Sequence, residues 1–142
     1  MVRVGIVGTN WITDKFLEAA KLVENFELSA VYSRTRERAE EVAEKYNVEM
    51  IFTNLEEMAA SSIIDAVYIA TPNAFHAEQS ILFLRNNKHV LCEKPLAANA
   101  SEVKKMFETA KEHDVLLMEA MKSTLIPNFM AIQNNLHKIG RI

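Results

Sequence analysis

The sequence is poor in cysteine and contains no long apolar run. Cys92 is the only cysteine, so no disulfide can form within the chain, which is typical of proteins in a reducing compartment. No apolar run approaches the roughly 20 residues that a membrane-spanning helix needs. The first residues have neither the apolar stretch nor the small-residue cleavage site of a signal peptide. We therefore expect a cytoplasmic protein that does not bind membranes.

An excess of charge of one sign is also lacking. The 16 basic and 19 acidic side chains give a net charge of −3, which does not favour binding to nucleic acid or to an anionic membrane. No group of His, Cys, Asp or Glu has the spacing of a metal site, and no Ser-His-Asp or Cys-His arrangement is evident. There is no linker rich in proline or glycine, so 142 residues with 49% hydrophobic content predict one domain with a real core.

What the sequence does contain is a repeated change from short continuous apolar runs to helical spacing. Continuous runs are typical of strands that helices bury on both faces. They lie at residues 4–7, 28–32, 66–70, 89–92 and 115–118, with a shorter strand at 50–52. Helical stripes lie at 12–23, 39–46, 80–84 and 103–110, with further helices at 54–60 and from residue 127. Asn54 and Ser101 are the expected helix starts. The alternation predicts an α/β fold, a doubly wound parallel sheet of the Rossmann type.

The turn after the first strand carries a degenerate dinucleotide-binding motif. In G-x-G-x-x-G spacing, Gly8 takes the first position, Asn10 the second and Thr13 the third. Asparagine tolerates a left-handed backbone best among residues other than glycine, so Asn10 is a plausible substitute. Main-chain amides from Asn10 to Ile12, at the start of the helix, would then face a diphosphate. The alternative is a plain strand-to-helix turn that uses Gly and Asn for backbone reasons alone.

The end of the second strand lacks the carboxylate that usually binds the free 2′-hydroxyl of NAD. Ser33 and Arg34 stand there instead, followed by Arg36 and Arg38. A hydrogen bond to a charged group contributes about 1.5–3 kcal/mol, so one Arg–phosphate pair could favour NADP about ten- to a hundredfold. We therefore expect NADP as the cofactor, with NAD as the alternative. Arg36 and Arg38 could instead be solvated helix residues that pair with nearby glutamates.

Two further segments carry a more specific pattern. The sequence Thr-Pro-Asn-Ala-Phe-His follows the strand at 66–70, and a Glu-Lys-Pro tripeptide follows the strand at 89–92. Together with the opening Gly-Ile-Val-Gly-Thr, they resemble the N-terminal domain of the glucose-fructose oxidoreductase, inositol dehydrogenase and rhizopine catabolism (Gfo/Idh/MocA) family. The resemblance spans residues 1 to about 125. Departures are Asn10, where a second glycine is usual, and Lys122, where relatives often carry an arginine.

Residues that follow parallel strands meet at one edge of the sheet, where open α/β sheets bind their ligands. The resemblance implies that Thr71 and Pro72 border the cofactor and that Asn73 and His76 lie near the nicotinamide ribose. His76 could instead be a capping or surface residue. The complete set of expected cofactor-binding residues is Gly8, Thr9, Asn10, Trp11, Ile12, Ser33, Arg34, Arg38, Thr71, Pro72, Asn73, His76, Glu93 and Lys94.

Lys94 is the expected catalytic residue. The resemblance implies that its ammonium polarises or hydrogen-bonds the reacting substrate oxygen and takes part in a proton relay. Glu93 would hold either Lys94 or a ribose hydroxyl in place, and an X-Pro bond such as Lys94-Pro95 can be cis. The alternative is that Lys94 is an ordinary surface lysine in a loop.

Members of this family carry a second domain that closes over the nicotinamide. We expect residues 1–125 to be the NAD(P)-binding domain, and residues 126–142 to be a linker helix and the start of a C-terminal α+β substrate domain absent from this chain. Residues 140–142 look like the beginning of another strand. This chain alone is then not expected to turn over substrate, because transition-state stabilisation needs both walls of the cleft.

The resemblance leaves three functions open for the complete protein. The first is hydride transfer between NAD(P) and a small carbohydrate-like substrate, a sugar, polyol or related hydroxyl or ketone, by a homo-oligomer. The second is a non-catalytic NAD(P)-binding sensor. The third is glycoside cleavage that uses the nicotinamide only transiently, without net redox.

Overall fold

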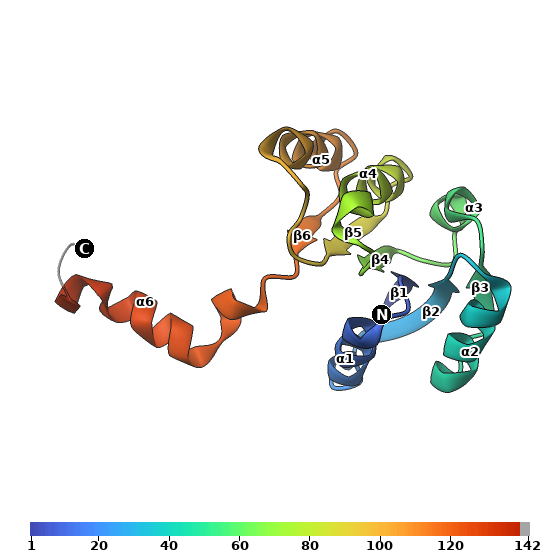
Figure 1. Ribbon diagram of the computed structural model, residues 1–142, viewed down its shortest axis with the longest axis horizontal. Coiled ribbons are helices and arrows are strands. Elements are labelled where there is room, and N and C mark those ends of the chain that lie inside the picture. The colour runs from blue at the N-terminus through green and yellow to red at the C-terminus, as the bar shows by residue number, and fades with distance from the viewer. Residues whose placement is uncertain (140–142) are drawn as a thin grey trace.

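The computed structural model describes residues 1–139, which contain a six-stranded sheet with helices on both faces (Figure 1). Neighbouring strands are parallel throughout, in the order β3-β2-β1-β4-β5-β6. The strands are β1 (Val2–Val7), β2 (Phe26–Tyr32), β3 (Met50–Phe52), β4 (Ala66–Ile69), β5 (His89–Cys92) and β6 (Leu117–Glu119). The predicted doubly wound α/β fold is confirmed. The expected strand start at 140–142 lies outside the described residues.

The helices form two layers around this sheet. In Figure 1, α1 and α2 lie on one face, α3, α4 and α5 lie on the other, and α6 extends away from the sheet. Their bounds are α1 (Trp11–Ala20), α2 (Arg36–Tyr46), α3 (Leu55–Ala60), α4 (His76–Arg85), α5 (Ala100–Glu112) and α6 (Pro127–Ile139), with 3₁₀ turns η1 (Asn73–Phe75) and η2 (Lys122–Leu125). In the described part of the chain, no helix combines the length and the apolar character needed to cross a membrane.

The last strand begins later than its apolar run predicts. The run starts at Val115, but β6 starts at Leu117. Val115 and Leu116 form the connection from α5, and the Leu116 N–H donates to Nδ1 of His89 at 3.0 Å. Side-chain hydrophobicity could not separate these two residues from the strand, because the difference lies in main-chain hydrogen bonding.

Two helix predictions also need correction. The α5 helix is capped by Asn99, whose side chain accepts from the Glu102 N–H, and Ser101 lies inside its first turn. The first helix ends at Ala20, so Val23, which the apolar spacing placed on its buried stripe, is 57% exposed. In both cases the hydrogen bonds at the helix ends, rather than the apolar spacing, set the boundary.

The core lies in two clusters, one on each face of the sheet. Successive side chains of a strand point to opposite faces. Thus Ile6 of β1 and Tyr68 of β4 belong to the cluster under α1 and α2, whereas Val7 and Ile69 belong to the cluster under α3, α4 and α5. The two central strands are therefore buried on both sides, which explains their continuous apolar sequence.

An ion pair ties the start of β1 to the start of β4. Arg3 donates from Nε to the Asp65 carboxylate at 3.0 Å and from its main-chain N–H at 3.0 Å. These bonds lower the pKa of Asp65 from 3.8 to about 2. The pair lies at the amino ends of the strands, so it stabilises the fold without lining the opposite edge of the sheet.

We predict that Asp65→Asn lowers the free energy of unfolding by about 1 kcal/mol at neutral pH, the scale of a solvent-screened pair. Because the folded-state pKa of Asp65 lies below the unfolded one, this contribution is complete above pH ~4 and is lost as the pH falls toward ~2. Urea unfolding of both proteins at several pH values measures the difference. Glu24→Gln removes an exposed carboxylate and serves as the control. A difference that stays constant down to pH ~2 would contradict the assignment.

Candidate functional site

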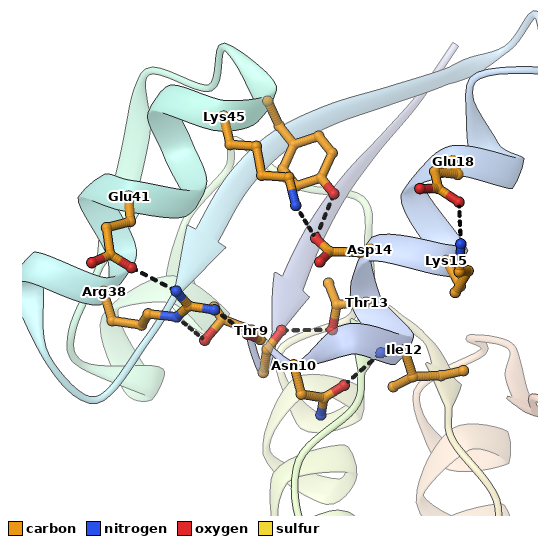
Figure 2. A network of polar contacts seen from close by, with 12 residues as sticks. Thr9, Asn10, Ile12, Thr13, Asp14, Lys15, Glu18, Arg38, Glu41 and Lys45 are labelled. Carbon is orange, nitrogen blue, oxygen red and sulfur yellow. Dashed lines mark hydrogen bonds and ion pairs between the residues drawn. The ribbon is translucent and has the colours of Figure 1, made fainter.

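The loop between β1 and α1 lies directly against the end of β4. Gly8 has a φ of +106°, and a Cβ at this position would lie 2.5 Å from the Ala70 carbonyl oxygen. Only glycine fits such a conformation and such a close approach of two main chains. The Thr13 hydroxyl donates to the Gly8 carbonyl at 2.9 Å and closes the turn (Figure 2). The first motif position thus needs glycine, while the third is occupied by a buried threonine.

Asn10 does not replace the second glycine in the way we expected. Its backbone is extended, with a φ of −96°, rather than left-handed. Its side-chain oxygen accepts from the Ile12 N–H at 2.9 Å (Figure 2), and its amide donates to the Ala70 carbonyl at 2.6 Å. Asn10 therefore caps α1 and fastens the loop to β4.

This cap changes which main-chain amides are available. The Ile12 N–H, one of those expected to face an anion, is occupied by Asn10. The N–H groups of Thr9, Asn10 and Trp11 donate to no acceptor within residues 1–139. Successive unpaired amides at a helix start form a concave site that suits an anion.

The arginines after β2 differ in their contacts. Arg36 pairs with Glu40, as the alternative interpretation proposed. Arg38 pairs with Glu41, but it also reaches back to Thr9, donating to the carbonyl at 2.7 Å and to the hydroxyl at 3.3 Å (Figure 2). Lys45 and Tyr46, further along α2, both bond Asp14 of α1, so the first two helices are joined at a second place.

A cleft of about 1020 Å³ follows the carboxyl edge of the sheet from Arg34 and Arg38 to the end of β4. Of the predicted residues, Gly8, Thr9, Asn10, Ser33, Arg34, Arg38, Thr71 and Pro72 line it. Apolar side chains that we did not predict, from Leu55, Phe75, Ile81 and Leu82, line it as well. A planar apolar group could pack against these side chains, while a charged group meets the arginines.

A second cleft of about 630 Å³ adjoins the first and shares Asn10, Ala70 and Thr71 with it. The remaining predicted residues line this part, namely Trp11, Ile12, Asn73, His76, Glu93 and Lys94. All fourteen predicted residues therefore lie on two adjoining clefts at one edge of the sheet. Lys94 and Gly8 lie at the same edge, as the open-sheet rule requires.

His76 lines the second cleft, but its ring is bound on both sides by the protein itself. Its side chain is fully buried, and both ring nitrogens contact main-chain carbonyls, Nδ1 that of Pro95 and Nε2 that of Thr71, each at 2.8 Å. The ring thus joins the loop after β4 to the loop after β5. The proximity of His76 to a nicotinamide ribose stays a prediction, and both ring nitrogens already have main-chain partners.

The turn that carries Lys94 is held by two further side chains that sequence reasoning missed. The Tyr68 hydroxyl donates to Glu93 at 2.7 Å, and the other carboxylate oxygen of Glu93 accepts from the Lys94 N–H at 3.2 Å. The carboxylate of Glu119, the last residue of β6, accepts from the Leu96 N–H at 2.8 Å. Their only sequence signals are a hydroxyl inside an apolar strand and a carboxylate at a strand end. The Lys94–Pro95 bond is cis.

Burial controls the ionisation of two groups beneath the cleft. Burial, followed by the hydrogen bond to Glu93, raises the pKa of Tyr68, so its hydroxyl remains a donor at neutral pH. Burial likewise raises the pKa of the Cys92 thiol to about 12, which makes it an inert core side chain rather than a nucleophile. Within residues 1–139, no cluster of His, Cys, Asp and Glu could hold a metal ion.

A parallel sheet with a glycine turn after its first strand and a cleft along its carboxyl edge defines a Rossmann dinucleotide-binding domain. Residues 2–121 match the model of the oxidoreductase family with an NAD-binding Rossmann fold, and the chain belongs to this Gfo/Idh/MocA family. The resemblance noted from the motifs is confirmed.

Relatives and solved structures agree with this assignment. The chain is 56% identical over 142 residues to the scyllo-inositol 2-dehydrogenase (NADP(+)) IolU of Bacillus subtilis, and 47% identical to an uncharacterized oxidoreductase of Escherichia coli. KijD10, a 3-ketoreductase from Actinomadura kijaniata solved with NADP, superposes with a TM-score of 0.89 at 30% identity over 96% of this chain. The chain spans 43% of the length of each of these three proteins.

We predict that Gly8→Ala weakens NADPH binding about tenfold or more, equivalent to at least ~1.4 kcal/mol. The added Cβ meets main-chain atoms of Ala70, so the loop itself must move. Gly5→Ala is the matched control, because its Cβ would meet the flexible end of Met58, away from both clefts. Fluorescence titration measures both variants. Equal affinity in the Gly8→Ala and wild-type chains would contradict the assigned loop.

Proposed function

We propose that this chain is the cofactor-binding domain of an NADP-dependent oxidoreductase that transfers a hydride to or from a sugar- or polyol-like substrate. The observation that carries the proposal is the pair of adjoining clefts, which join the Gly8 loop to Lys94 along one edge of the sheet. The 56% identity to a scyllo-inositol 2-dehydrogenase (NADP(+)) supports the cofactor and the substrate class.

The residues present fit a dinucleotide. The amides of Thr9, Asn10 and Trp11 have no acceptor in the described part of the chain and follow Gly8, where a Cβ would collide with Ala70, so they suit a diphosphate. The chemistry that the cofactor supplies when bound is hydride transfer at the nicotinamide ring. Thr71 and Pro72 line the larger cleft, where they would border the nucleotide.

The second cleft is where Lys94 acts. In our proposal, the Lys94 ammonium binds the reacting substrate oxygen and helps to move its proton, while Asn73 and Trp11 border the nicotinamide end. Glu93 holds the lysine turn from within, and His76 supports it through Pro95 instead of binding the ribose.

Residues 1–125 form the cofactor domain in this proposal, and residues 126–142 lead toward a second domain. The last helix exposes four apolar side chains, Phe129, Met130, Ile132 and Leu136. Their exposure supports the proposal that a second domain packs against this helix. We also propose that the complete protein is a cytoplasmic homo-oligomer, a prediction that the free thiol of Cys92 and these exposed side chains permit. No observation favours the sensor or the glycoside-cleaving alternative.

We predict that the wild-type chain binds NADPH about ten- to a hundredfold more tightly than NADH. Arg34 lines the larger cleft and has no ion-pair partner among residues 1–139, so its guanidinium is available to a 2′-phosphate. Arg34→Met should remove most of this preference by weakening NADPH binding alone. Fluorescence titration with both cofactors measures it. Comparable dissociation constants for NADPH and NADH in the wild-type chain would refute the preference.

We predict that Lys94→Ala lowers turnover about 10²- to 10⁴-fold in the complete protein, assayed with scyllo-inositol and NADP⁺, because a proton-transfer group is lost. The dissociation constant for NADPH should change little. Lys104→Ala is the control, since Lys104 pairs with Glu108 on α5 outside both clefts. Normal turnover in the Lys94→Ala variant would remove Lys94 from the mechanism.

A further inference from the structure

Three arginines follow β2 at alternate positions, and the structure gives each a different environment. Arg34 lines the larger cleft without an ion pair inside residues 1–139. Arg36 pairs with Glu40, is 71% exposed at its side chain, and lines neither cleft. Arg38 lines the larger cleft but is already bound to the protein. The sequence alone does not distinguish them.

All three nitrogens of the Arg38 guanidinium have partners. One terminal nitrogen donates to the Thr9 carbonyl at 2.7 Å, Nε donates to the Thr9 hydroxyl at 3.3 Å, and the other terminal nitrogen pairs with Glu41 at 2.5 Å (Figure 2). A planar guanidinium offers its donors in a rigid fork. Thr9 occupies the side of the fork formed by Nε and one terminal nitrogen, so a phosphate can bind Arg38 only through the terminal N–H groups that remain of its five donors.

The contact with the Thr9 carbonyl has a consequence for the neighbouring amide. The peptide bond between Thr9 and Asn10 is planar, so its C=O and N–H point in opposite directions. By fixing the carbonyl, Arg38 sets the direction of the Asn10 N–H, one of the loop amides that have no acceptor among the described residues 1–139. Asn10 is also tied to Ala70 and Ile12 by its side chain, so the loop is held on both sides of this peptide.

We propose that Arg38 is a positioning residue for the diphosphate-binding loop rather than a reader of the 2′-phosphate, which is left to Arg34. The cofactor part of this inference rests on the proposed function. The diphosphate is common to NADP and NAD, whereas the 2′-phosphate is not. Arg38 therefore supports binding of both cofactors to the same extent, and Arg34 distinguishes between them.

The test compares three variants of this chain by titration with NADPH and NADH. Arg38→Met should weaken binding of both cofactors by a similar factor of about ten, and Arg38→Lys, which keeps one donor group, should restore part of it. Arg34→Met should weaken NADPH alone. Arg36→Met is the matched control and should change neither. Loss of NADPH affinity alone in Arg38→Met, or no loss at all, would overturn the proposal.

A readout without cofactor separates this inference from the proposed function. Hydrogen-deuterium exchange of the amides of Ile12, Thr13 and Asp14, which donate to Asn10, should become faster in Arg38→Met, but not in Arg34→Met or Arg36→Met. Unchanged exchange in Arg38→Met would refute the positioning role even if both cofactors bind. Faster exchange in a chain that shows no preference for NADPH would retain the positioning role and reject the cofactor preference.

Discussion

The close approach of two main chains, at Gly8 and Ala70, is the constraint on which the site depends. A side chain at Gly8 would collide with the Ala70 carbonyl, so the loop after β1 can lie on the end of β4 only because Gly8 has none. Asn10 then bonds the same carbonyl group, and Thr13 closes the turn behind it. Because β1 and β4 are neighbours where the strand order reverses, this contact joins the two halves of the sheet.

The far end of the cleft is built by a different principle. The turn that carries Lys94 is not packed against bare backbone but is bound by side chains from three other elements, Tyr68 of β4, His76 of α4 and Glu119 of β6. Tyr68 and His76 are buried, so the bonds they make are shielded from competing water. An exposed lysine can thus be presented on a rigid support, which a catalytic group requires.

The Gly8–Ala70 contact and the bonds that hold the Lys94 turn fix the main chain along the cleft, while other residues of the cleft are exposed. Arg34 and Trp11 are exposed at the rim, where they can meet a ligand. Arg38 combines both characters, because it is half-exposed and yet bonded to the loop. Family membership establishes the NAD-binding Rossmann fold. The different contacts of the arginines after β2 make it possible to distinguish what each contributes to cofactor binding.

The sequence by itself determined the fold class, the strands and the location of the cleft. Continuous apolar runs mark buried parallel strands, and motifs at their ends must meet at one edge because the strands are parallel. Tertiary structure decided what individual side chains do there. Asn10 fastens its loop to the end of β4, and His76 links two loops, because each side chain found a main-chain partner far away in sequence, Ala70 for Asn10 and Pro95 for His76. Periodicity reports which face is buried, but polar partners across the fold depend on distances and angles that no local pattern contains.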